Sequence, residues 1–177
     1  LDTPGHEAFA ALRERGARLA DLAVLVIAAD DGVRPQTLEA LASIKAAGIP
    51  YIVALNKIDK PGANVEMTKN SLVENEIYIE GMGGDVSFVA ISAKVGTGVD
   101  ELLDVLLLSA ELAELRGDPR APASGKVIEA HLDQKRGTHG TLILTDGTLK
   151  SGQYVVSGDT YAPVRIMEDW SGKRITE

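Results

Sequence analysis

Apolar and polar residues follow two different patterns along this chain of 177 residues. In the first two-thirds, unbroken apolar runs predict strands covered on both faces at residues 23–29, 51–55 and 88–91. Apolar residues three and four apart predict helices from Pro35 to a stop at Gly48, over residues 65–75 and over residues 99–116. Strands that alternate with helices predict an α/β domain with a parallel sheet over residues 1–116.

The last third of the chain has a different texture. Residues 117–125 are rich in Gly, Pro, Ala and Ser, and they predict a linker. Short β-type segments separated by turn residues follow, at 126–132, 141–145, 154–157 and 164–167. They predict a second domain over residues 126–177, a small β-barrel that is incomplete because about 50 residues are few for a closed barrel.

Composition excludes several classes of protein. Apolar residues make up 45% of the chain and charged residues 25%, as in globular proteins, and there is no cysteine. A disulfide scaffold, a thiolate metal site and a cysteine nucleophile are therefore excluded. No apolar run reaches the roughly 20 residues that span a bilayer, and the start has no signal-peptide pattern, so we expect a cytoplasmic protein without membrane contacts.

Charge is distributed unevenly between the two parts. Residues 1–116 contain 10 basic and 18 acidic residues, whereas residues 117–177 contain 8 of each. This balance does not favour a protein that coats nucleic acid, and we expect no DNA partner. An RNA contact would be local. Lys135 and Arg136 are candidates for it, although a solvated basic pair is the simpler interpretation.

Two polar motifs, NKID (residues 56–59) and SAK (residues 92–94), each follow directly after a predicted strand. The carboxyl ends of parallel strands form the edge at which α/β sheets bind ligands. In SAK, the small Ala93 lets its N–H approach a base carbonyl, while Ser92 and Lys94 brace the loop. An ordinary polar turn is the alternative interpretation of NKID, and the second motif in register after the next strand weakens it.

The chemistry of NKID favours guanine as the ligand. The Asp59 carboxylate can accept hydrogen bonds from N1 and the exocyclic amine of guanine, whereas adenine has no hydrogen at N1. The methylene stem of Lys57 can lie along the base plane while its ammonium stays in water. Asn56 can bridge the base edge to a neighbouring loop.

A third motif, DTPGH (residues 2–6), is placed where a strand would end and a helix would begin near Glu7. Asp2 can hold Mg²⁺ through a water molecule, and Gly5 lets its N–H approach a γ-phosphate. His6 is the candidate that orients an attacking water. A capping or surface histidine is the alternative, and the flanking DTPG disfavours it.

Other features are less specific. The sequence contains no G-x-x-x-x-G-K-[ST] loop, so most of the affinity for phosphate is expected to be missing. His131 and His139 have no partner at ligand spacing and are interpreted as structural or solvated. Asp30 and Asp31 fit a capped turn better than a metal pair. Trp170 either packs on the barrel or belongs to a surface patch.

Several segments closely resemble the bacterial translation initiation factor two family of translational GTPases. They are DTPGHEAF (2–9), RGA (15–17), AADDGVRPQTLEA (28–40), NKIDKPGAN (56–64) and SAKVGTGVDELL (92–103). GTLKSGQYVVSG (147–158) is similar to the family's second, β-barrel domain. The resemblance implies most of a GTPase domain after the phosphate loop plus part of the second domain, so the chain alone is expected to be inactive.

The resemblance also implies a partial P-loop-type GTPase fold, with GTP or GDP and Mg²⁺ as ligands. Intact members bring initiator tRNA to the small ribosomal subunit, promote joining of the large subunit and hydrolyse GTP on the ribosome. By position, Asp2 and Gly5 correspond to the magnesium and γ-phosphate contacts, and His6 to the water-positioning residue. The guanine-site residues correspond to Asn56, Lys57, Asp59, Ser92, Ala93 and Lys94.

Two other functions fit the sequence less well. One is a natural short chain that keeps the guanine pocket and acts as a non-catalytic ribosome-docking module, and the weaker one is an α/β hydrolase that uses Asp2, His6 and Asp59. The family's sheet has a central strand beside residues 23–29. Without that strand a hydrophobic edge is bare, and we expect the isolated chain to self-associate through it or to be marginally stable.

Overall fold

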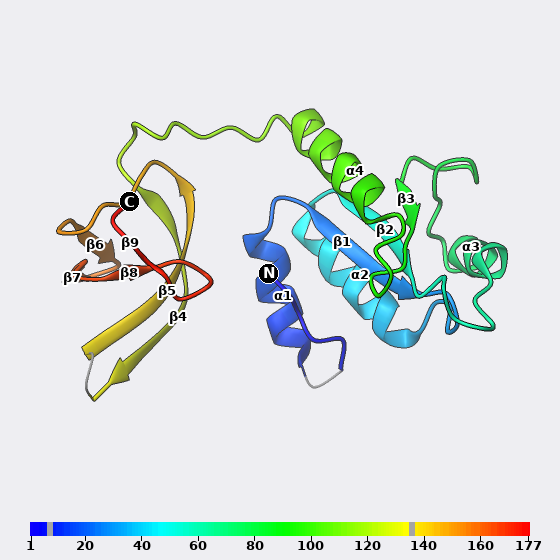
Figure 1. Cartoon of the computed structure of the whole chain (residues 1–177), viewed down its shortest axis with the longest axis horizontal. Helices are drawn as coiled ribbons and strands as arrows, with labels where there is room; N and C mark the ends of the chain where they lie inside the picture. The colour runs from blue at the N-terminus through cyan, green and yellow to red at the C-terminus, as the bar shows by residue number, and fades with distance from the viewer. Residues whose placement is uncertain (7–8, 135–136) are drawn as a thin grey trace. The chain divides into compact units, whose positions relative to one another are not determined.

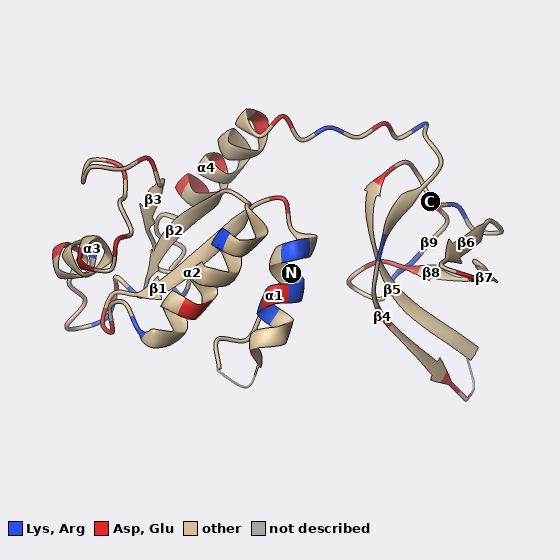
Figure 2. Cartoon of the chain, turned by 180° about the vertical axis from the view of Figure 1, so that it is seen from behind, with Lys and Arg blue, Asp and Glu red and all other residues tan. Residues whose placement is uncertain are grey.

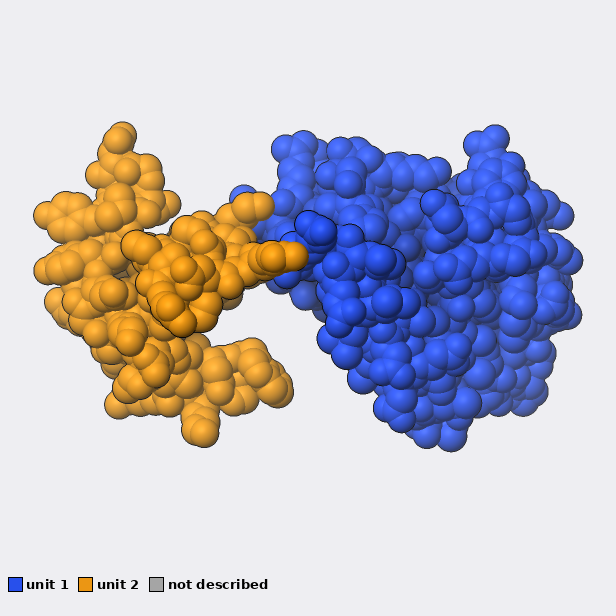
Figure 3. Space-filling model, turned by 90° about the horizontal axis from the view of Figure 1, so that it is seen from above, with its two compact units in different colours: residues 1–115 blue, residues 116–177 orange. Residues whose placement is uncertain are grey.

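The computed structural model describes residues 1–6, 9–134 and 137–177, which fall into two compact units, Leu1–Leu115 and Arg116–Glu177 (Figure 3). Unit 1 contains α1 (Ala10–Leu19), β1 (Ala23–Ala28), α2 (Pro35–Ala47), β2 (Tyr51–Asn56), α3 (Val65–Glu74), β3 (Phe88–Ala90) and α4 (Val99–Leu112) (Figure 1). Unit 2 contains β4 (Ser124–Asp133), β5 (Gly137–Asp146), β6 (Tyr154–Ser157), β7 (Thr160–Pro163), β8 (Met167–Glu168) and β9 (Arg174–Ile175). The expected helix start at Glu7 and the pair Lys135 and Arg136 lie outside the described residues.

Unit 1 is built on a parallel sheet with the strand order β1-β2-β3. The middle strand is buried on both faces, since Val53, Ala54 and Leu55 are all 0% exposed. On one face, Leu41 and Ile44 of α2 and Leu72 of α3 join the strand residues in a single core. On the other face, α4 contributes Leu102, Val105 and Leu106. The structure confirms the predicted α/β class.

Local sequence signals set the ends of the helices in unit 1. Pro35 is the first residue of α2, where its missing N–H costs nothing, and Gly48 ends the helix with φ of +69°. The Asn64 side chain caps α3 by accepting a hydrogen bond from the Met67 N–H at 2.9 Å. The predicted start at Pro35 and stop at Gly48 are therefore confirmed.

Two predictions for unit 1 are wrong in part. The strand at 23–29 is not covered on both faces, because α4 packs on β2 and β3 and leaves Val24 and Val26 of β1 37% and 58% exposed. The last helix ends at Leu112 rather than at residue 116. Beyond it Glu114 adopts φ of +50°, a left-handed conformation that a continuing helix cannot contain.

Unit 2 consists of antiparallel strand pairs. β4 pairs with β5, β6 with β7 and β8 with β9, and no closed barrel forms among the residues that the structure describes. The predicted strand at 164–167 is wrong. The two-residue turn at Gly158 and Asp159 places Thr160 directly opposite Ser157, so the partner of β6 begins immediately after the turn. The linker is also shorter than predicted, since β4 already begins at Ser124.

The charge of unit 1 varies between its helices. Figure 2 shows basic and acidic residues together on α1, whereas α4 carries acidic residues only. Among the described residues, no helix is both long and apolar enough to cross a membrane.

Candidate functional site

The NKID motif begins on the last residue of β2. The side-chain oxygen of Asn56 accepts hydrogen bonds from the Lys57 N–H at 2.7 Å and from the Ala93 N–H at 3.0 Å. Lys57 has φ of +67°, which residues other than glycine rarely adopt. Such backbone strain persists where the surrounding contacts hold it, and it is frequent at ligand sites. Asn56 thus stabilises a strained loop and ties it to SAK.

The SAK motif follows β3 and meets NKID at the carboxyl edge of the sheet. Ser92 is 1% exposed, and its Oγ donates a hydrogen bond to Asp59 Oδ1 at 2.6 Å. The Ile58 N–H donates to the Ile91 carbonyl at 3.3 Å. These bonds bring Asp59 and Ala93, which are 34 positions apart, to the same place in the fold.

Electrostatics keep Asp59 ionised. The hydrogen bond from Ser92 lowers the pKa of Asp59 below its ordinary value of 3.8, and the charges of Lys94 and Lys60 act in the same direction. Partial desolvation acts against them and is outweighed. The carboxylate is therefore available as a double acceptor at neutral pH.

Asp30, in the loop after β1, is a contact of NKID that sequence reasoning missed. Its Oδ2 accepts from Lys60 Nζ at 2.8 Å, and its Oδ1 lies 3.8 Å from Lys57 Nζ. The hydrogen bond from Lys60 lowers the pKa of Asp30. Asp31 instead pairs with Arg34 at 2.8 Å, so the two carboxylates bind separate cations. The position of Asp30 after a strand that runs parallel to β2 is the sequence feature that could have predicted this contact.

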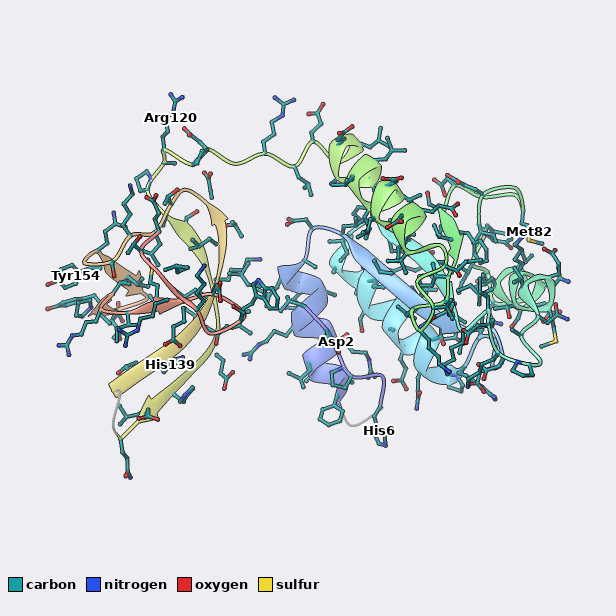
Figure 4. The ribbon with its side chains drawn as sticks, in the orientation of Figure 1. Asp2, His6, Met82, Arg120, His139 and Tyr154 are labelled. Carbon is teal, nitrogen blue, oxygen red and sulfur yellow. The ribbon has the colours of Figure 1, made fainter. Side chains whose placement is uncertain are left out.

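The DTPGH segment is placed differently from the expectation. Residues 2–6 are exposed and form no strand. The segment is instead tied to α1, where Arg13 binds the carbonyls of Pro4 and His6 at 3.0 and 2.7 Å. Figure 4 shows His6 at the end of this loop, and its ring lies edge-on to that of Phe9, the residue before α1, with ring centroids 6.3 Å apart.

The parts of DTPGH fit phosphate chemistry to different degrees. A methyl group on Gly5 would meet no atom within 4 Å, so the space beside this backbone is open. No group of three or more His, Cys, Asp or Glu that could hold a metal occurs in residues 1–6, 9–134 and 137–177. Asp2 therefore fits Mg²⁺ only as one ligand among phosphate oxygens and waters, the usual arrangement for this ion.

The weaker candidates lie in unit 2. His131 and His139 face each other across the β4–β5 pair, with rings stacked at 5.1 Å and 24°, so each has the other as its partner. Trp170 is 99% exposed and therefore belongs to the surface of the described unit rather than to its core.

Comparisons with known proteins agree with this division. Residues 1–111 match the family described as the elongation factor Tu GTP binding domain, and residues 122–177 match elongation factor G domain 2. The chain is 52% identical over all 177 residues to translation initiation factor IF-2 of Lachnoclostridium phytofermentans. The match extends over 100% of this chain but over only 16% of the length of that relative.

Two solved structures of translation factors resemble the chain. The bacterial selenocysteine-specific elongation factor EF-Sec matches with a TM-score of 0.73 at 27% identity, over 98% of this chain and 30% of that one. GDP-bound aIF5B from Aeropyrum pernix matches with a TM-score of 0.64 at 28% identity, over 80% and 30%. Together with the family matches, these similarities show that the chain belongs to the translation initiation factor IF-2 family of translational GTPases.

Proposed function

We propose that this chain supplies the guanine-reading and catalytic-loop residues of a GTP-binding translation initiation factor. The observation that carries the proposal is the junction of the two motifs, in which Ser92 donates to Asp59 and Asn56 accepts from Ala93. The non-catalytic docking module is not favoured, because the matching families are translational GTPases.

Each residue of the junction has a role toward the base. Asp59 accepts from N1 and the amine of guanine, and the bond from Ser92 fixes the carboxylate for this task. The stem of Lys57 lies along the ring. The N–H of Ala93 serves the guanine carbonyl. Because Asn56 already occupies that N–H, the base must share it with Asn56 or displace the amide.

The phosphate end of the nucleotide is assigned to DTPGH. Asp2 would hold Mg²⁺ through a water molecule, the Gly5 N–H would contact the γ-phosphate, and His6 would orient the attacking water. Mg²⁺ supplies neutralisation of the phosphate charge. Lys94 supports the base site, since its charge helps to keep Asp59 ionised.

The partners of the complete factor follow from the family. We infer that it acts in the cytoplasm on both ribosomal subunits, with initiator tRNA, and that it hydrolyses GTP there. The name of the 52% identical relative supports a role in translation initiation.

The chain by itself is expected to bind guanine nucleotides weakly. It contains the base site but no phosphate-cradling loop, so the Kd for fluorescent GDP should exceed about 1 μM. Unlabelled GDP should displace the probe and ADP should not, and Asp59→Asn should abolish the signal. Nanomolar binding would show that the phosphate contribution is misjudged, and equal displacement by ADP would refute the guanine site.

The free edge of β1 is expected to make the isolated chain self-associate. The Ala23 and Ala29 N–H groups point to β2, so by alternation the backbone groups of Val24 and Val26 point to the open edge. Light scattering after size-exclusion chromatography should show a mass that rises with concentration. Val26→Lys should restore a monomer, while Val156→Lys on β6 should not. A monomeric wild-type chain at all concentrations contradicts this expectation.

A further inference from the structure

Arg13 of α1 is a buried cation that none of the roles above uses. It is 4% exposed, and within the described part of the chain it is the only charged residue in the buried class. Its Nη1 donates to the carbonyls of Pro4 and His6, and its Nη2 donates to Glu39 Oε2 of α2 at 2.6 Å. Its Nε is buried and makes no hydrogen bond to described residues.

This geometry links three segments through one guanidinium. A buried arginine is costly unless its donors are paired, and here two carbonyls and a carboxylate accept from three of its five N–H groups, while Nε is left without a partner among the described residues. The planar guanidinium can donate to the loop carbonyls from Nη1 and to Glu39 from Nη2. A lysine ammonium is a single point charge and cannot hold both positions in the same way.

The bound carbonyls flank the residues that matter most for catalysis. Pro4 and His6 lie on either side of Gly5, so the bonds from Arg13 fix the peptide planes around the Gly5 N–H and the base of the His6 side chain. The loop also packs closely on α1. A Cβ at Gly16 would lie 2.8 Å from Thr3 Cγ2, an approach that only glycine permits without a shift.

We propose that Arg13, anchored by Glu39, is a positioning residue that holds the DTPGH loop in the orientation needed for GTP hydrolysis. The proposal deepens the proposed function and rests on it. Arg13 touches the loop backbone and not the nucleotide. Its loss should therefore lower kcat for hydrolysis while leaving the affinity for GDP unchanged, since the base site is held by separate bonds.

The first test measures the loop itself and does not depend on GTP. Hydrogen exchange of the wild-type chain is compared with that of Arg13→Lys and of Arg18→Gln, a matched control on the exposed side of α1 where Arg18 pairs with Glu14. The Phe9 N–H donates to the His6 carbonyl at 3.0 Å, so Arg13→Lys should make the Phe9 amide exchange at least about tenfold faster, and Arg18→Gln should not. Unchanged exchange in Arg13→Lys would overturn the proposal.

The second test uses a full-length family member that carries this segment. On ribosomes, Arg13→Lys should reduce kcat by about tenfold to a hundredfold with GDP affinity preserved. The swap Arg13→Glu with Glu39→Arg restores an ion pair but no donor to the Pro4 and His6 carbonyls, so it should stay slow. Recovery in the swap, or parallel losses of kcat, GDP affinity and thermal stability, would overturn the proposal. If the wild-type protein binds no GTP, the proposed function fails while the exchange result still stands.

Discussion

Replacing Asp59 by asparagine is expected to move nucleotide preference from guanine toward xanthine. The carboxylate accepts two hydrogen bonds from guanine, whereas the asparagine amide offers one acceptor and one donor, which matches the carbonyl that xanthine has in place of the amine. In a full-length family member, the ratio of GDP to xanthosine diphosphate affinity should change by up to about 10⁴-fold. Competition against a fluorescent nucleotide measures this ratio.

The matched control for this substitution is Asp31→Asn. Asp31 lies after the neighbouring strand and pairs with Arg34 on the surface, so its loss should leave the ratio unchanged. An unchanged ratio in a folded Asp59→Asn variant would show that another group recognises guanine.

The wild-type preference should not depend on pH in the neutral range. The hydrogen bond from Ser92 lowers the pKa of Asp59 below 3.8, so the contribution of the charged form is lost only as the pH falls through that lowered value. Guanine preference is therefore expected to be equal at about pH 6 and about pH 8. A change between them would indicate that the reading carboxyl has a raised pKa.

Replacing His6 by alanine is expected to slow GTP hydrolysis on the ribosome by about 10²- to 10⁴-fold, the usual contribution of a group that orients a reacting water and its proton. GDP affinity should stay within about threefold of wild type, because the base is held by Asp59 and not by the DTPGH loop. Single-turnover hydrolysis with the full-length protein separates the two quantities.

His131→Ala is the control for the histidine substitution. His131 is exposed on β4 and stacks on His139 in unit 2, so its loss should leave kcat unchanged. If His6→Ala retained the wild-type rate, the attacking water would be oriented by another group, and Arg13 would have lost its proposed task as well. The exchange of the Phe9 amide, which donates to the His6 carbonyl, would then still report whether Arg13 holds the loop.

Strands and helices were predicted best where the local pattern was strong. The strand predicted at 51–55 is β2, and the helix predicted from Pro35 begins and ends as expected. The prediction of a strand at 164–167 was wrong. The position of the turn at Gly158, rather than apolar content, determines which residues pair with β6. The last helix was predicted too long, because apolar periodicity continues past the point where Glu114 leaves the helical conformation.

The positions of the site motifs were predicted correctly where the motif directly follows a strand. NKID and SAK lie where the alternation of strands and helices placed them, and hydrogen bonds join them. DTPGH has no strand before it here, so the same rule did not apply to it. No sequence motif indicates the contacts of Arg13 with Glu39 and of Asp30 with Lys60.

The sequence by itself determined the α/β class, the division of the chain into two parts and the positions of the NKID and SAK motifs after strands, because periodicity, turn residues and motif spacing are properties of neighbouring residues. Only the tertiary structure decided that Ser92 holds Asp59, that Ala93 is already bonded to Asn56 and that Arg13 anchors the DTPGH loop. Contacts such as Arg13 with Glu39 join residues 26 positions apart, and Ser92 with Asp59 join residues 33 apart. Such pairs form because strand order and helix packing bring distant segments together, and no local pattern encodes that arrangement.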